Sequence, residues 1–152
     1  MTVPSTTDTQ ATASALNDLL ADLQVSYYKI RHFHWLVKGT TFYTLHEQFE
    51  KMYEAWAEHI DEVAERLIAI DHEPLKTLAA NIERASIGEQ PTTPDAMDMA
   101  RELADDFAKV IHRIDDATEA AEKAGLRSTE NTLDDIRDGV DKHRWMLRRF
   151  TA

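Results

Sequence analysis

Apolar residues in the first quarter of the sequence recur with the period of an α-helix, and this pattern constrains the fold more than any other feature. Their spacing alternates between four and three residues through Leu16, Leu20, Leu23, Tyr27, Ile30, His34 and Val37. Such a stripe lies on one face of a helix of about 25 residues and must be buried against other elements. We expect this helix to end at Gly39.

A second helix with the same kind of face is predicted directly afterwards. Its apolar positions are Leu45, Phe49, Met52, Trp56, Ile60, Val63, Leu67 and Ile70. Thr44 and Glu47 have the spacing of a capping box, which indicates a helix start. Pro74 cannot continue a helix, so we expect the second helix to stop before it.

Two more long helices are predicted in the second half of the chain. The third carries Leu103, Phe107, Val110, Ile114, Ala117 and Ala121, and the fourth carries Leu133, Ile136, Val140 and Leu147. The segment Thr93-Pro94-Asp95 favours a helix start with Thr93 as the cap, and Gly125 favours a helix end. The fourth helix is expected to follow Ser128-Thr129.

A long crossover joins the second and third predicted helices. Residues 75–93 contain a short apolar cluster, followed by Gly88 and Pro91, which predicts a short helix inside this connection. Two long hairpins joined by one long crossover are typical of the ferritin-like form of the all-α four-helix bundle. We therefore predict one such domain over residues 12–152, preceded by a flexible Thr-rich tail over residues 1–11.

Composition and charge narrow the possible functions. The chain has no cysteine, so any metal must be bound through nitrogen and oxygen ligands. Its formal charge of −11 attracts cations and repels nucleic acid at long range. The N-terminus lacks the charged and apolar regions of a secretion signal, and no window approaches the roughly 18 apolar residues of a membrane span. We expect a cytoplasmic protein with no membrane association.

Five of the side chains in residues 32–67 are candidate metal ligands because of their positions on the predicted helices. They are His34 in the first apolar stripe, and His46, Glu50, Asp61 and Glu65 on the second predicted helix. His46 pairs with Glu50 and Asp61 pairs with Glu65, and the two residues of each pair are four positions apart. All four side chains fall within about 100° of one another around the helix. Their face lies roughly 120° from the core face, so it points beside or away from the chain's own bundle. Exposure to solvent would account for any one of these carboxylates on a helix surface. Ordinary core packing would account for a single histidine in the apolar stripe.

Distance limits how these residues can cooperate. Eleven residues separate Glu50 from Asp61, which is about 16 Å along a helix. One metal ion cannot touch both, because metal–ligand bonds span only about 2 Å. The two pairs are symmetric about position 55.5, so an antiparallel copy of the helix related by a two-fold axis would bring opposite pairs together. Ala57, on the same face, would let the two helices approach closely. The geometry permits such a shared site.

The same stretch resembles the Dps family, the mini-ferritins first described as DNA-binding proteins of starved cells. The matching features are His34-Trp35, Gly39, His46-Glu47 and the segment Asp61-Glu-Val-Ala-Glu65-Arg66. The order of the predicted helices also fits, so the resemblance covers nearly the whole chain.

The resemblance implies a di-iron ferroxidase centre shared by two chains. Carried over residue by residue, His34, His46 and Glu50 of one chain would face Asp61 and Glu65 of its two-fold mate. The family more often has aspartate where this chain has Glu50.

At the level of the whole protein, the resemblance implies a homo-oligomeric hollow dodecamer. Such a shell would oxidise ferrous iron, commonly with hydrogen peroxide and otherwise with oxygen, and store the ferric product. Trp35 would lie near the centre as an electron donor, although ordinary packing explains it equally well.

Some positions depart from the family or remain unassigned. Iron uptake pores in the family often have aspartates where this chain has Ser128 and Asn131. The acidic residues Glu130, Asp134 and Asp138 either replace those pore aspartates or form a solvent-exposed face of the helix. Four histidines match no ligand position of the family: His59, His72, His112 and His143.

Three alternative functions are testable. An intrachain di-iron site would use Glu-x-x-His pairs, and no glutamate here precedes a histidine by three residues. DNA compaction would need basic tails, whereas residues 1–14 contain no Lys or Arg and one Asp, so DNA binding is unlikely on this sequence. A purely structural helical module would need neither the stripe histidine nor the paired carboxylates.

Overall fold

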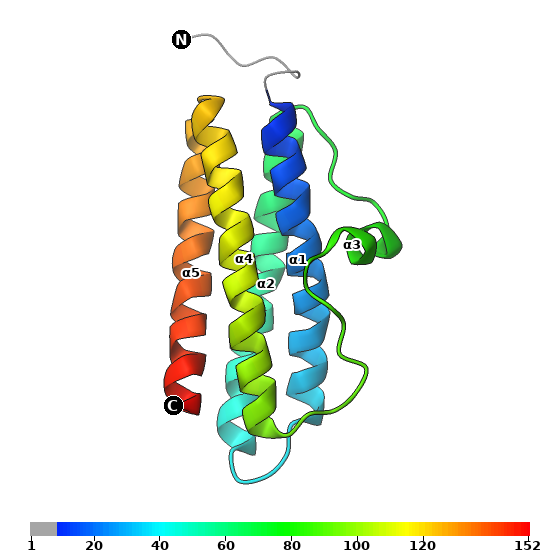
Figure 1. The fold of residues 1–152 in the computed structure, drawn as a ribbon, viewed down its shortest axis with the longest axis vertical. Coiled ribbons are helices and arrows are strands. Elements are labelled where there is room, and N and C mark those ends of the chain that lie inside the picture. Colours follow the sequence, from blue (N-terminus) through cyan, green and yellow to red (C-terminus); the bar gives the residue numbers. More distant parts are fainter. Residues whose placement is uncertain (1–8) are drawn as a thin grey trace.

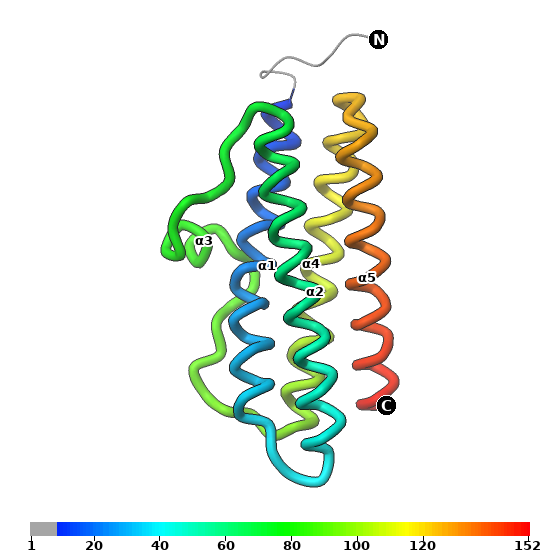
Figure 2. The backbone as a smooth tube through the Cα atoms, turned by 180° about the vertical axis from the view of Figure 1, so that it is seen from behind, coloured from blue at the N-terminus to red at the C-terminus, as the bar shows by residue number. Residues whose placement is uncertain are grey.

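Five α-helices make up the described part of the chain, residues 9–152 of a computed structural model (Figure 1). They are α1 (Gln10–Leu36), α2 (Phe42–Ala69), α3 (Leu78–Arg84), α4 (Ala96–Lys123) and α5 (Arg127–Thr151). The four long helices run side by side, with α1 antiparallel to α2 and α4 antiparallel to α5, and α3 lies in the crossover outside α1 (Figure 2). The predicted all-α, ferritin-like four-helix bundle with a short crossover helix is confirmed.

Most of the predicted tail, residues 1–8, lies outside the described residues, while Gln10 and Ala11 are the first two residues of α1. None of the described helices combines the length and apolar character that crossing a bilayer would need.

The predicted apolar stripes meet in one core. Trp56, Phe33, Phe49 and Phe107 are its largest fully buried side chains. The Trp56 ring packs against Phe107 of α4 with 4.4 Å between ring centroids, and its indole N–H donates to Ser26 Oγ of α1 at 2.8 Å. Trp56 therefore joins α1, α2 and α4, and burying a side chain of this size contributes about 2–3 kcal/mol or more to stability.

Several helix starts differ from the sequence prediction. Helix α2 begins at Phe42, so the predicted capping box at Thr44 and Glu47 is wrong, because Thr44 already lies in the first turn. The cap of α4 is Asp95, whose side chain accepts from the backbone N–H of Asp98 at 2.9 Å, and not Thr93. Helix α5 begins at Arg127, one residue before Ser128. Helix α1 ends at Leu36, three residues before the predicted stop at Gly39. The predicted stop of α4 is confirmed, because α4 ends at Lys123 and Gly125 follows its C-cap with a positive φ of 71°.

The crossover is attached to the bundle by one buried carboxylate. Asp22 of α1, which is fully buried, accepts from the backbone N–H and the hydroxyl of Ser86, both at 2.6 Å, and from the backbone N–H of Ile87 at 3.2 Å. Arg113 of α4 also donates to it at 3.3 Å. Because the charge is fully hydrogen-bonded, it can be buried, and it fixes the crossover against α1 and α4.

A second buried charge links α1 to α4 nearer the other end of the bundle. Lys29 Nζ lies 2.7 Å from Asp106 Oδ2 and 3.1 Å from Glu102 Oε2. The side chains of Lys29 and Asp106 are only 4% and 7% exposed. Desolvation raises the pKa of Asp106, and the hydrogen bond and charge of Lys29 act in the opposite direction.

Candidate metal centre

His34 and His46 hold each other at the turn between α1 and α2. Their rings stack with centroids 3.8 Å apart and planes 13° from parallel. His34 Nδ1–H donates to the carbonyl oxygen of His46 at 2.6 Å, and His46 Nδ1–H donates to that of His34 at 2.8 Å. A carbonyl can only accept, so both Nδ1 atoms carry a proton, and in the neutral rings both Nε2 atoms keep a lone pair. This tautomer is the one that binds a metal through Nε2.

Two aromatic residues that the sequence did not single out complete this arrangement. Phe42 stacks on His46 with centroids 4.8 Å apart, and Tyr53 meets His34 edge-on at 5.3 Å. The Tyr53 hydroxyl donates to Glu50 Oε1 at 3.4 Å. Partial burial, followed by the charges of Glu50 and Glu54, raises the pKa of Tyr53, so the phenol stays protonated and available as a donor. The i, i+3 spacing of Glu50 and Tyr53 was a signal in the sequence.

Asp61 and Glu65 lie farther along α2 on an exposed face. The chain does not bring them to the histidines, since among residues 9–152 no three histidine, aspartate or glutamate side chains lie close enough together to hold one metal. Of the five candidate ligands, a single chain thus assembles the histidine pair with Glu50 nearby and leaves two carboxylates apart. Their sharing with a second chain stays a prediction.

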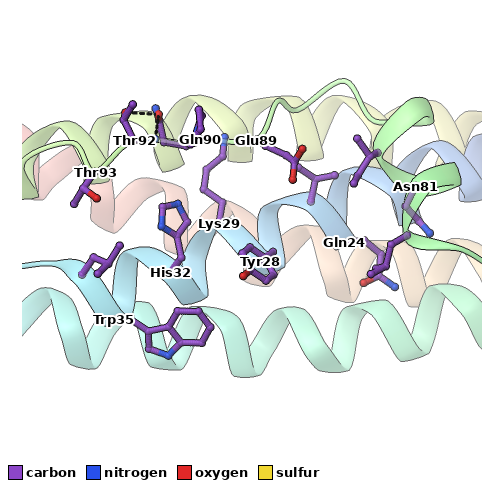
Figure 3. A pocket seen from close by; sticks show the side chains of 15 residues that line it. Gln24, Tyr28, Lys29, His32, Trp35, Asn81, Glu89, Gln90, Thr92 and Thr93 are labelled. Atoms are coloured by element: carbon purple, nitrogen blue, oxygen red, sulfur yellow. Dashed lines mark hydrogen bonds between the residues drawn. The ribbon is translucent and has the colours of Figure 1, made fainter.

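Trp35 is half-exposed beside His34 on α1. The Arg31 guanidinium lies 5.2 Å from the centre of its ring, and Tyr28 meets it edge-on at 6.2 Å. Both aromatic rings border a groove of about 810 Å³ between α1 and the crossover, with Gln90 and Thr93 on the opposite side (Figure 3).

The exposure of large apolar side chains around this groove is unusual for a chain that acts alone. Tyr28, Trp35, Leu78 and Ile82 are 59%, 53%, 77% and 48% exposed. Contiguous apolar surface of this kind is typical of a protein interface.

Two antiparallel pairs of long helices joined by one long crossover define the ferritin-like class. The ferritin-like domain matches residues 13–152. The chain is 40% identical over 141 residues to a DNA protection during starvation protein of Brevibacillus brevis, covering 93% of this chain and 95% of the relative. It is 38% identical over 135 residues to DNA protection during starvation protein 2 of Bacillus anthracis, covering 89% and 92%.

Solved structures agree. Dps from Staphylococcus aureus superposes with a TM-score of 0.91 at 34% identity, covering 94% of this chain and 96% of that one. Dps from Vibrio cholerae O1, described as a member of a broad superfamily of ferritin-like diiron-carboxylate proteins, gives 0.93 at 33% identity, covering 97% and 92%. The chain belongs to the Dps family. Membership places it among proteins of iron storage and protection in general.

Proposed function

We propose that this chain is a ferroxidase subunit that oxidises Fe(II), with hydrogen peroxide as the preferred oxidant, and stores the ferric product in a hollow dodecamer, protecting the cell from oxidative damage. The observation that carries the proposal is the reciprocal hydrogen bonding of His34 and His46, which leaves two Nε2 lone pairs free for a metal. Iron is the substrate and cargo of this reaction. The cytoplasmic location stays a prediction from the sequence.

In this proposal each centre is completed by a second chain. Asp61 and Glu65 of a two-fold mate would supply the carboxylates that the first chain cannot bring to His34 and His46. Two observations support this: the incomplete ligand set of one chain, and the exposure of Asp61 and Glu65 on α2, which leaves both carboxylates available to a neighbouring chain. A second chain packed over this face of α2 would also exclude water from the centre.

The proposed ligand set suits the chemistry. Two imidazoles with three carboxylates bind Fe(II), and the negative charge of the carboxylates favours the Fe(III) product. Two ferrous ions together supply the two electrons that reduce one peroxide molecule to water, so no one-electron hydroxyl radical needs to form. Tyr53 orients the Glu50 carboxylate, and in this proposal Trp35, which follows His34 on α1, serves as an electron donor.

Ferrous oxidation by the purified protein should be faster than in buffer, and faster with peroxide than with oxygen. Stopped-flow absorbance of the ferric product at several iron-to-protein ratios measures both rates. A His34→Ala/His46→Ala variant, which lacks both nitrogen ligands, should lose about a hundredfold or more in rate. Uncatalysed rates with both oxidants at every ratio would contradict the ferroxidase proposal.

A DNA-protective role through binding is the second candidate, because the relatives named above are called DNA protection proteins. We expect DNA binding to be weak at physiological salt, since a chain of charge −11 with no Lys or Arg in its first 14 residues can release few phosphate counterions. Gel mobility shifts over a salt series measure it. Nanomolar binding with a steep salt slope would show that this expectation is wrong.

A further inference from the structure

Two histidines at the interface between α2 and α5 have no role in the proposed centre. They are His59 of α2 and His143 of α5, and neither belongs to the His34 and His46 cluster. Both ring nitrogens of His59 and the Nδ1 of His143 are buried and make no hydrogen bond with any described residue. Buried polar atoms of native proteins are nearly always paired, so three such nitrogens in one place call for a ligand or bound water.

Both rings pack against the same side chain, Trp56. The Trp56 ring lies 5.5 Å from the His59 ring and 6.1 Å from the His143 ring, centroid to centroid. His59 also faces Gly139, one helical turn before His143, and a Cβ at Gly139 would lie 3.5 Å from His59 Nε2. The missing side chain leaves space beside that nitrogen.

Two imidazoles with unpaired ring nitrogens favour a metal ion as the ligand. In a neutral imidazole one ring nitrogen carries a proton and the other a lone pair, and the lone pair is the metal-binding donor. Both rings pack against Trp56, so they need little reordering to bind an ion.

We propose that His59 and His143 bind one divalent transition-metal ion within each chain, at a site separate from the His34 and His46 pair. Imidazole nitrogen suits ions such as Co(II), Zn(II) and Fe(II). No three ligating side chains are clustered among the described residues, so water fills the remaining positions. The site does not depend on the proposed ferroxidase function, and it can be tested with a redox-inert ion.

Trp56 provides a local reporter, because it touches both rings. The chain has three tryptophans, so a Trp35→Phe/Trp145→Phe background leaves Trp56 as the sole one. Titration of this protein with Co(II) should quench its fluorescence saturably. Adding His59→Gln/His143→Gln should weaken the quenching at least tenfold and remove one bound Co(II) per chain in equilibrium dialysis. Adding His34→Ala/His46→Ala instead should leave the quenching intact.

Gly139→Ala tests the same site without changing a ligand. Alanine is favoured over glycine in a helix interior, and its Cβ meets only His59 at ordinary contact distance, so this variant should fold at least as well as the wild type. Its methyl group narrows the space beside His59 Nε2, and we expect Co(II) binding at this site to weaken several-fold. The proposal is overturned if both His59→Gln/His143→Gln and Gly139→Ala show the quenching and the Co(II) stoichiometry of the wild type. If the double variant does not fold, unchanged quenching in Gly139→Ala alone overturns it.

Discussion

Mixed oligomers of two inactive variants should recover about a quarter of the wild-type ferroxidase activity. The first variant is His34→Ala/His46→Ala, and the second is Asp61→Ala/Glu65→Ala. Each should be inactive alone, because every centre in it lacks either the nitrogen ligands or two carboxylates. If two chains share each centre, a mixed pair contains one centre with no intact half and one centre with both halves intact.

The expected recovery follows from counting. Random assembly of equal amounts makes half of the two-fold pairs mixed, and half of the centres in those pairs are restored. Distinct fluorescent labels on the two variants verify that mixing has occurred, and each variant refolded by itself provides the baseline. A well-mixed oligomer that is no more active than the separate variants would exclude the shared centre, whereas it would leave iron oxidation within one chain open.

Replacing Lys29 with alanine should destabilise the protein by about 3–5 kcal/mol. The change leaves the Asp106 carboxylate, 7% exposed, without the ammonium group 2.7 Å away. An uncompensated buried charge costs far more than the pair contributes, so Lys29→Met/Asp106→Leu should regain most of the loss. Urea unfolding at one fixed protein concentration measures the effect, since the stability of an oligomer depends on concentration.

The matched control is an exposed ion pair. Lys51 and Glu47 are 57% and 64% exposed and lie 3.4 Å apart on α2. Lys51→Ala should change stability by no more than about 0.5 kcal/mol, because solvent screens such pairs. Equal effects of Lys29→Ala and Lys51→Ala would mean that burial does not set the cost of losing a partner here.

Sequence periodicity was enough to predict the helices and the core, because burial of one face imposes a spacing that can be read directly. Leu16, Phe49 and Ile136 are fully buried, as their places in the stripes predicted. Helix starts were less predictable, since the residue that caps a helix depends on where the preceding loop ends. Thus Asp95 takes the role expected of Thr93.

The candidate centre was predictable in composition and less so in geometry. The identities and spacing of His34, His46 and Glu50 are visible in the sequence. The direction of the two Nδ1 hydrogen bonds is not, because it depends on how residues 37–41 turn the chain. The exposure of Trp35 could not be inferred either, because adjacent residues of one helix need not face the same surroundings.

The two hydrogen bonds that join His34 and His46 have a thermodynamic consequence. Each ring is fastened to the backbone of the other residue, so the rotational freedom of both side chains is lost when α1 and α2 fold together. A metal ion then meets a preorganised pair of nitrogens, and its binding carries little further entropic cost. By thermodynamic linkage, an ion that binds only this hydrogen-bonded arrangement also stabilises the packing of the end of α1 against the start of α2. Bound metal should therefore slow amide hydrogen exchange at the α1–α2 turn, far more than in the middle of either helix.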